Sequence, residues 1–228
     1  KGWRNKYKNY KKKIIKTGSP RFDIWRKNIY TKIFKDEIFY LKKYSPFFFI
    51  PSTFISSDSW LKKEIINEKR MKKNNNKLTS SFLEKRIQAR KDSYKNFLAF
   101  VDLIKKLTKD FPRHKIIVKP HPTENIHDWQ KKFLKKQYSN VVINNKFDLT
   151  SYIAASECVI FSESTAGVQS MIMGKKAISY NLKNNVTFRN FANKCAPQTS
   201  DYKFLLNFLK KNYLSRQLKY KKKIKDKF

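Results

Sequence analysis

A strand, a polar loop and the start of a helix are encoded in Cys158-Val-Ile-Phe-Ser-Glu-Ser-Thr-Ala-Gly167. The apolar, partly β-branched run at its beginning predicts a buried strand of a parallel sheet. Residues 168–173 continue with a helical pattern, and Gly174 follows at the position where helices commonly end. This order of elements is typical of open α/β folds, in which ligands bind where strands end.

Hydroxyl groups are concentrated at the opening of this predicted helix, on Ser162, Ser164 and Thr165. Backbone N–H groups at a helix start, together with the helix dipole, favour anions, and Gly167 permits a close approach. The alternative is an ordinary N-cap formed by Ser162 or Ser164. Gly occurs only four times in the chain, yet two glycines bracket this helix, which favours the anion site.

A second stretch with the same organisation is Lys115-Ile-Ile-Val-Lys-Pro-His-Pro122. The proline rings on both sides of His121 restrict the backbone, so the imidazole is held at the end of a predicted strand. It would be placed to donate a hydrogen bond to a departing phosphate, with Lys119 adding positive charge. The alternative is a surface turn without a ligand. We expect the His121 and Ser164 stretches to meet at adjacent strand ends.

The whole chain alternates between short apolar runs and amphipathic segments. Strands are predicted at 14–17, 46–51, 115–118, 141–143, 158–161 and 177–180, and helices at 22–44, 60–71, 80–109, 124–138, 148–153, 168–173 and 201–213. Such alternation predicts the α/β class, with a doubly wound parallel sheet and right-handed crossovers.

Three regions are expected. Residues 1–45 would be the remnant of an N-terminal domain followed by an inter-domain helix, residues 46–182 a Rossmann-like domain, and residues 183–228 a helical basic tail. Because the chain begins with Lys and its first residues lack a self-contained apolar pattern, we expect it to begin inside a longer protein.

The net charge of +36 suggests a polyanionic partner, but its make-up argues against nucleic acid. Of the 53 basic residues only nine are Arg, the residue that reads phosphates and bases with its planar fork. The lysines are also spread over nearly every segment. We therefore prefer a compositional bias on a solvated surface, while a peripheral contact with an anionic membrane stays open.

Several chemistries find no support in the sequence. His114, His121 and His127 lack metal-ligand spacing, and no GxxxxGK[ST], GxGxxG or GxSxG occurs. Glu124 and Glu163 are candidate general bases, but we prefer solvated surface carboxylates for both. No apolar run reaches 18 residues and no signal peptide is visible, so a cytoplasmic location is expected.

Three stretches in this order resemble the bacterial surface carbohydrate (capsule and lipopolysaccharide) biosynthesis proteins, which are GT-B glycosyltransferases. They are Thr17-Gly-Ser-Pro-Arg-Phe-Asp23, Val118-Lys-Pro-His-Pro122, and Ser164-Thr-Ala-Gly167 before Gly174-Lys-Lys-Ala-Ile-Ser-Tyr180. Similar stretches occur in the related polysialyltransferase, Kdo-transferase and CDP-glycerol glycerophosphotransferase groups.

The resemblance implies a GT-B arrangement of two Rossmann-like domains, of which this chain holds the nucleotide-donor half. His121 would be the catalytic residue, and Lys119, Ser162, Ser164, Thr165 and Gly167 would bind the donor. Gly18, Arg21 and Asp23 would lie near the inter-domain crossover.

The resulting expectation is a metal-independent enzyme without a cofactor. It would transfer a sugar from a CMP-, CDP- or UDP-linked donor to a polysaccharide or lipid-linked acceptor. The expected location is cytoplasmic, and a peripheral position at the inner face of the membrane stays open. Two alternatives remain: a CDP-activated glycerophosphotransferase of the same fold, and a non-catalytic basic module that binds nucleic acid or membrane.

Overall fold

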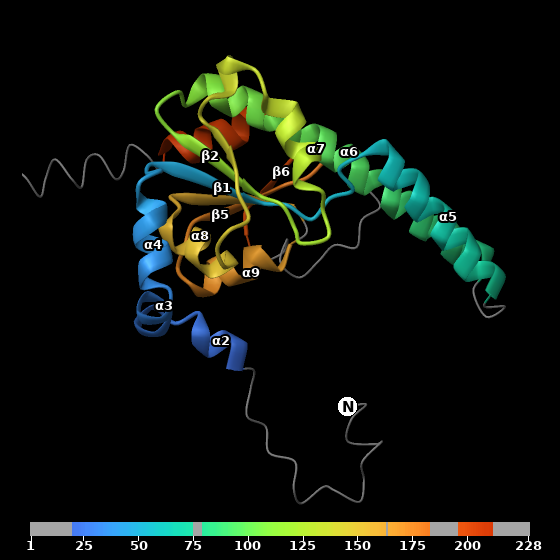
Figure 1. Ribbon diagram of the computed structural model, residues 1–228, viewed down its shortest axis with the longest axis horizontal. Helices are drawn as coiled ribbons and strands as arrows, with labels where there is room; N and C mark the ends of the chain where they lie inside the picture. Colours follow the sequence, from blue (N-terminus) through green and yellow to red (C-terminus); the bar gives the residue numbers. More distant parts are fainter. Residues whose placement is uncertain (1–19, 75–78, 163, 183–195, 212–228) are drawn as a thin grey trace, which may run out of the picture.

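The computed structural model describes residues 20–74, 79–162, 164–182 and 196–211. These residues form a six-stranded parallel sheet in the order β3-β2-β1-β4-β5-β6, with helices on both faces (Figure 1). The strands are β1 (Phe47–Pro51), β2 (Lys115–Lys119), β3 (Val141–Ile143), β4 (Cys158–Phe161), β5 (Ala177–Tyr180) and β6 (Gln198–Thr199). The expected α/β class with a doubly wound parallel sheet is confirmed.

The central strands are buried on both faces, which explains why they lack an alternating polar pattern. Every residue of β1, β4 and β5 is buried. In β1, Phe48 and Ile50 point into one core while Phe47 and Phe49 point into the other. Helix-covered parallel sheets produce near-continuous apolar runs for this reason.

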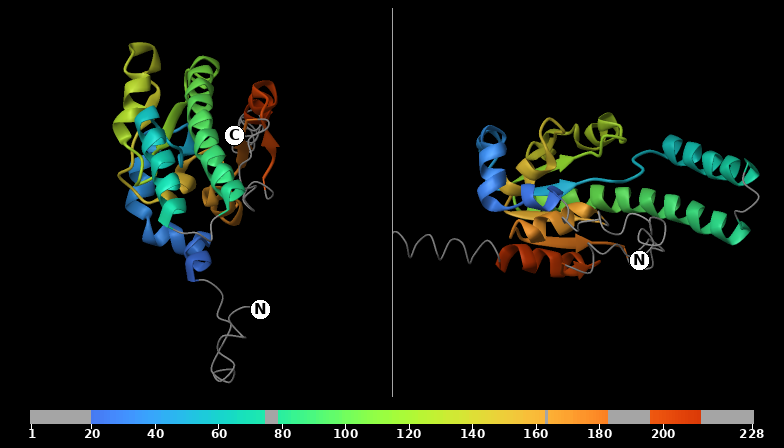
Figure 2. Two further views of the ribbon diagram at one scale, coloured as in Figure 1. Left: turned by 90° about the vertical axis from the view of Figure 1, so that its right-hand side faces the viewer. Right: turned by 90° about the horizontal axis from the view of Figure 1, so that it is seen from below.

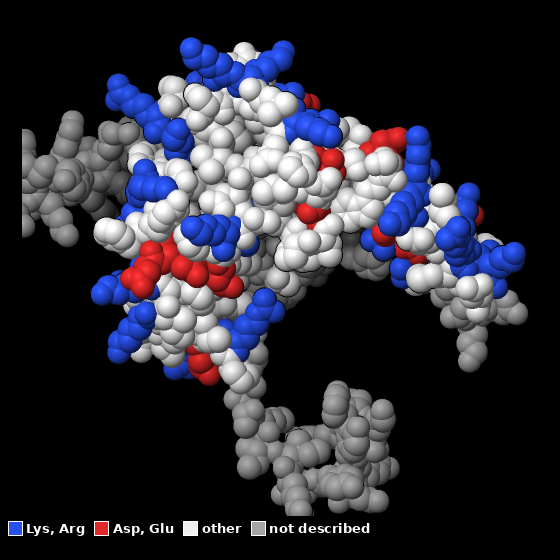
Figure 3. Space-filling model, viewed as in Figure 1, with Lys and Arg blue, Asp and Glu red and all other residues white. Residues whose placement is uncertain are grey.

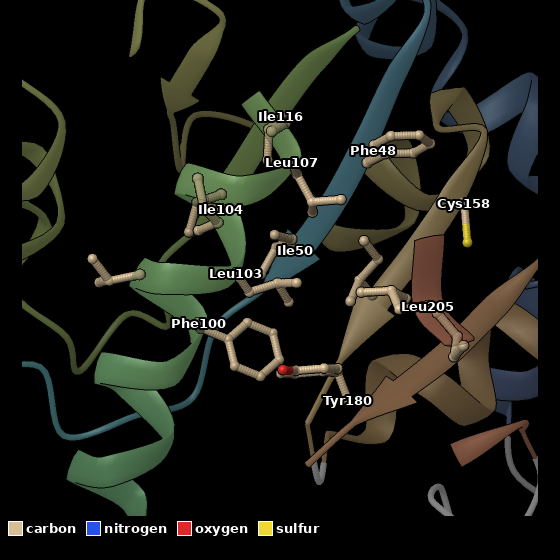
Figure 4. Close-up of a cluster of buried hydrophobic side chains, with 14 of the residues drawn as sticks. Phe48, Ile50, Phe100, Leu103, Ile104, Leu107, Ile116, Cys158, Tyr180 and Leu205 are labelled. Carbon is tan, nitrogen blue, oxygen red and sulfur yellow. The ribbon is translucent and has the colours of Figure 1, made fainter. Parts of the chain in front are cut away.

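The first face is covered by helix α6 (Ser80–Asp110), helix α7 (Ile126–Gln130) and a helix over residues 202–211. Figure 4 shows Leu103 and Leu107 of α6 directed at the strand residues Ile50 and Phe48, and Phe100 facing Tyr180 of β5. The second face is covered by α3 (Lys27–Ile33), α4 (Lys35–Lys42), α8 (Leu149–Ala155) and α9 (Thr165–Ile172).

Helix α5 (Asp58–Asn74) and the first half of α6 form a two-helix arm (Figure 2). The arm extends past the carboxyl edge of the sheet, and the second half of α6 returns along the first face. Glu68 of α5 is buried between the helices and accepts hydrogen bonds from Arg86 and Arg90 of α6. A charged pairing therefore joins the two helices, and Glu68 is the only buried residue among the described residues of α5.

The single helix expected over residues 22–44 is wrong, because three helices occupy this segment: α2 (Pro20–Ile24), α3 and α4. The chain leaves helical geometry at Arg26 (φ −69°, ψ 138°) and Phe34 (φ −107°, ψ 24°). On one straight helix Trp25 and Tyr30 would point about 140° apart. The breaks allow both residues to be buried in the same core.

Other boundaries also differ from expectation. Residues 124–138 form α7 and two 3₁₀ turns, η2 (Lys131–Phe133) and η3 (Lys136–Tyr138), instead of one helix. Thr79, the residue before the predicted start, caps α6 by accepting the Phe82 N–H. The sheet extends beyond residue 182, since β6 pairs with β5 and Leu205 is buried in the core. The strand predicted at 14–17 lies outside the described residues.

Candidate functional site

The strand order places β1 and β4 side by side at the centre of the sheet, and the winding of the chain reverses between them. In open α/β sheets, ligands bind beside the carboxyl ends of the strands at such a switch point. The loops that start at Ser52, after β1, and at Ser162, after β4, therefore flank the position where a ligand is expected.

The loop after β2, which carries His121, lies on the same edge but one strand further away. Because β1 pairs with both β2 and β4, our expectation that the His121 and Ser164 stretches follow adjacent strands is wrong. Neighbouring strands are about 4.8 Å apart, so the ends of β2 and β4 are separated by about 10 Å. An extended ligand, rather than a single anionic group, would bridge this distance.

Both serines after β4 are buried and bonded to protein groups. Ser162 Oγ donates to Asn181 Oδ1 at 2.5 Å, which ties the end of β4 to the end of β5. Ser164 is the N-cap of α9, where its Oγ accepts the Ala166 N–H at 3.2 Å. The N-cap alternative is thus confirmed for Ser164. The donor-binding role of the two serines stays a prediction.

Thr165, the first residue of α9, differs from the two serines because it is exposed. In the described part of the chain, neither its backbone N–H nor its hydroxyl has a hydrogen-bond partner. The Gly167 N–H, by contrast, is bonded to the Ser164 carbonyl at 3.0 Å. Thr165 is therefore the residue of this first turn whose donor groups have no partner among the described residues.

Gly167 is required for packing. A Cβ atom at this position would lie 2.3 Å from Cζ of Phe161, the last residue of β4. We expected the missing side chain to make room for a ligand, but the space is filled by the Phe161 ring. Gly174 behaves as expected for a residue just past a helix end, with a positive φ of 66°.

The imidazole of His121 is exposed at the edge of the sheet and oriented by Thr123. The Thr123 hydroxyl lies 2.8 Å from His121 Nδ1, and the Thr123 N–H donates to the same atom at 3.3 Å. Because Nδ1 accepts these bonds, the ring proton of the neutral form sits on Nε2. Nε2 is thereby available as a hydrogen-bond donor, which is the role predicted for this residue.

Lys119, the last residue of β2, is directed toward the loop after β3. Its Nζ donates to the Asn145 carbonyl at 3.2 Å and lies 5.5 Å from the centre of the Tyr152 ring. Burial lowers the pKa of Lys119, while the carboxylates of Asp148 and Glu37 oppose that shift. The Asn145 contact lies beyond β3, whereas the Tyr152 ring stacks on Phe49 of β1.

Glu124 is buried, so our preference for a solvated surface carboxylate is wrong. Its Oε1 accepts the N–H groups of Phe54 at 2.9 Å and His121 at 3.4 Å, and its Oε2 accepts the Trp129 Nε1–H at 2.7 Å. The Ser52 hydroxyl donates to the same carboxylate. Burial raises the pKa of Glu124, although all of these donors act in the opposite direction.

The loop after β1 is a part of the site that the sequence reasoning did not include. Ser56 Oγ donates to Asp128 Oδ2 at 2.8 Å, and the Ile55 N–H donates to Ser93 Oγ at 3.0 Å, so the loop is held against both α7 and α6. A signal was present in the sequence, because a polar stretch follows an apolar strand there as it does after β2 and β4.

Two of the residues predicted near an inter-domain crossover, Arg21 and Asp23, lie on α2. Asp23 forms an ion pair with Arg26, with 3.0 Å between the guanidinium nitrogen and the carboxylate oxygen. The guanidinium of Arg21 lies 5.5 Å from the centre of the Trp25 ring. Nothing in these contacts joins them to the carboxyl edge. Gly18 and Glu163 lie outside the described residues. No group of His, Cys, Asp and Glu within the described ranges could hold a metal ion.

The sheet order, the crossover helices and the polar carboxyl edge define a Rossmann-like α/β domain. No protein-family model matches the sequence, and no curated protein matches it. Among solved structures, the chain is similar to one described as "Thermosulfurimonas dismutans KpsC, beta Kdo 2,4 transferase", with a TM-score of 0.36 and 12% sequence identity. The match covers 83% of this chain and 55% of that chain. No helix in the described segments has the length and apolar character needed to cross a bilayer.

Proposed function

We propose that this chain is the donor-binding half of a glycosyltransferase that uses a nucleotide-activated sugar. The observation that carries the proposal is the arrangement at one edge of the sheet, where the ends of β1, β2 and β4 all lead into polar loops around a switch point. Nucleotides bind at this edge in open α/β sheets. The order of the three sequence stretches agrees with a GT-B donor domain.

In the proposed reaction, an acceptor hydroxyl attacks the anomeric carbon of the donor sugar. The bond between that carbon and the phosphate oxygen breaks, and a base outside the described residues takes the hydroxyl proton. His121 Nε2–H would donate a hydrogen bond to the phosphate as its charge develops. The first turn of α9 at Thr165, on the far side of β1, would bind another part of the extended nucleotide donor. The acceptor would be a surface polysaccharide or a lipid-linked saccharide.

Calorimetric titration of the chain with CMP, CDP and UDP tests the donor site. His127 provides a matched control, because it is an exposed histidine six residues from His121 and lies on α7. We expect His121→Ala to weaken nucleotide binding at least tenfold and His127→Ala to leave it unchanged. Absence of binding by all three nucleotides would remove the donor site from consideration.

The same site geometry suits a CDP-activated glycerophosphate donor. In that reaction the acceptor oxygen attacks phosphorus, and CMP leaves with the bridging oxygen. The two reactions are separated by their products, since only the glycosyltransferase makes a new bond at an anomeric carbon. Incubation of the full-length protein with each donor, followed by mass analysis of the acceptor, distinguishes them.

The surface charge gives less support to a basic binding module. On the face shown in Figure 3, Lys and Arg are scattered over the visible elements, with acidic side chains between them. A nucleic-acid footprint is normally gathered on one face or along one helix. A salt titration against duplex DNA, single strands and anionic vesicles tests this alternative, because tight binding with a steep loss at high salt would favour it.

A further inference from the structure

One buried carboxylate joins the two loops at the carboxyl ends of β1 and β2. On the β1 side, Glu124 accepts the Ser52 hydroxyl and the Phe54 N–H. These two residues are buried and bracket Thr53, which is exposed. Glu124 therefore fixes the backbone on both sides of Thr53.

On the β2 side, the same residue holds the backbone of His121. The His121 N–H donates to Glu124 Oε1 at 3.4 Å, and the Glu124 N–H donates to the His121 carbonyl at 2.8 Å. The register of the two strands pairs Pro51 with Lys119, so Thr53 and His121 each follow the last pair by two residues. The exposed residue of each loop is thus tied to one carboxylate.

The hydroxyls of the β1 loop are not equivalent. Ser52 donates to Glu124, Ser56 donates to Asp128, and Ser57 lies 3.2 Å from the Ser59 hydroxyl. The Thr53 hydroxyl, in contrast, has no hydrogen-bond partner among the residues that the structure describes. It is the group of this loop that is free to meet a ligand beside the switch point.

Burying the Glu124 carboxylate away from water is unfavourable in free energy, so its position needs a reason other than packing. No Lys, Arg or His of the described segments forms an ion pair with Glu124, and an unpaired buried carboxylate is expensive. Its four donors come from β1's loop, β2's loop and the Trp129 ring of α7. The two carboxyl oxygens of Glu124 thus accept hydrogen bonds from three segments at once.

We propose that Glu124 is a positioning residue that holds Thr53 and His121 together at the carboxyl edge, and that Thr53 is a ligand contact for the phosphate or sugar oxygens of the nucleotide. The assignment of Thr53 rests on the proposed donor site. The positioning role of Glu124 does not depend on which nucleotide binds, so the two parts are tested by different measurements.

Hydrogen exchange without any ligand tests the positioning role. The amides to follow are Phe54 and His121, which donate to Glu124, and Val159, which donates to the Lys176 carbonyl inside the sheet. In Glu124→Gln the side-chain NH2 group would face groups that donate hydrogen bonds to the carboxyl oxygens of the wild type. We expect exchange to accelerate at least tenfold at Phe54 and His121 and to stay unchanged at Val159. Equal acceleration at all three amides, or at none, would overturn the positioning role.

Ser52→Ala provides a milder variant should Glu124→Gln fail to fold. It removes one donor and keeps the carboxylate, so a smaller local acceleration at Phe54 is expected. Unchanged exchange at the Phe54 amide in this folded variant would also contradict the proposal that Glu124 holds both loops.

Nucleotide titration tests Thr53. Thr53→Val keeps the shape of the side chain and removes the hydroxyl, and Thr31→Val makes the same change at an exposed site on α3. We expect Thr53→Val to weaken binding of CMP, CDP or UDP by about fivefold, with an unchanged thermal midpoint, and Thr31→Val to bind normally. Normal binding by Thr53→Val removes the contact while the donor site stands. If the wild type binds none of the nucleotides, the donor site and the Thr53 contact fail together, and the exchange result still decides the role of Glu124.

Discussion

The ring of Phe161 occupies the space in which a side chain at residue 167 would lie, with Cζ 2.3 Å from the position of a Cβ atom on Gly167. This contact joins the last residue of β4 to the first turn of α9. The helix approaches the strand end closely because residue 167 has no side chain. The placement of the helix start, and of Thr165 with it, thus depends on this glycine.

Gly167→Ala should lower the free energy of unfolding by about 1–3 kcal/mol, the usual cost of overpacking a filled core. The higher helix propensity of Ala offsets about 1 kcal/mol of this. Urea denaturation measures the change. In a Phe161→Leu background the same substitution should cost less, because the ring that it meets is gone. An equal cost in both backgrounds would mean that the contact is not the cause.

Ser164→Ala should lower the free energy of unfolding by about 1 kcal/mol, because it removes the N-cap of α9. Ser164→Asp retains an oxygen that accepts the Ala166 N–H and should recover most of the loss. Thr165→Val, one residue later, should leave stability within about 0.5 kcal/mol, as expected for an exposed site. Thermal denaturation measures the stability of the three variants and so compares loss of the N-cap with a substitution at an exposed site.

Glu68 should stabilise the arm most strongly near neutral pH. Hydrogen bonding to Arg86 lowers the pKa of Glu68 below its ordinary value of 4.5, so the charged form favours the folded state. That stabilisation is present above the unfolded-state pKa and is lost as the pH falls through the folded-state pKa. Glu68→Gln should cost about 1.5–3 kcal/mol at neutral pH, the value of hydrogen bonds to a charged group.

The difference in the free energy of unfolding between wild type and Glu68→Gln should shrink as the pH falls below 4.5. Urea denaturation at several pH values, followed by helical circular dichroism, measures it. A difference that stays constant down to strongly acidic pH would show that the carboxylate of Glu68 does not titrate in this way.

The contribution of Glu124 to stability should depend on pH in the opposite direction. Burial raises its pKa above the ordinary 4.5, so the folded state favours the protonated form. Its contribution to stability is complete below the unfolded-state pKa and declines as the pH rises through the folded-state pKa. The stability difference between wild type and Glu124→Gln should therefore narrow with rising pH. A difference that widens instead would contradict the raised pKa.

Local sequence patterns were sufficient for the strands and for several helix ends. The apolar runs around Phe49, Ile117 and Ile160 correspond to β1, β2 and β4, because central parallel strands need apolar residues on both faces. Asp148 was expected to begin a helix and does so by accepting the Thr150 N–H at 2.8 Å. In each case the responsible interaction lies within a few residues of the signal.

The burial of Glu124 could not be found in this way. Its partners Ser52 and Phe54 are 72 and 70 positions away along the chain, so no local pattern records them. The segment from Trp25 to Leu41 was similarly misleading, since its apolar spacing fits one helix and only the tertiary core requires three. The polar loop after β1 was visible in the sequence, but its place at the switch point follows from the strand order.

Helix α6 spans 31 residues without Gly or Pro, which corresponds to about 46 Å of continuous helix. One half pairs with α5 and the other half packs on the sheet, and Ser93, between the two halves, accepts the Ile55 N–H of the loop after β1. The arm and that loop are thus connected through one continuous helix, α6. A molecule that docked on the arm and tilted the outer half of α6 would therefore also move Ser93 and the β1 loop beside the switch point.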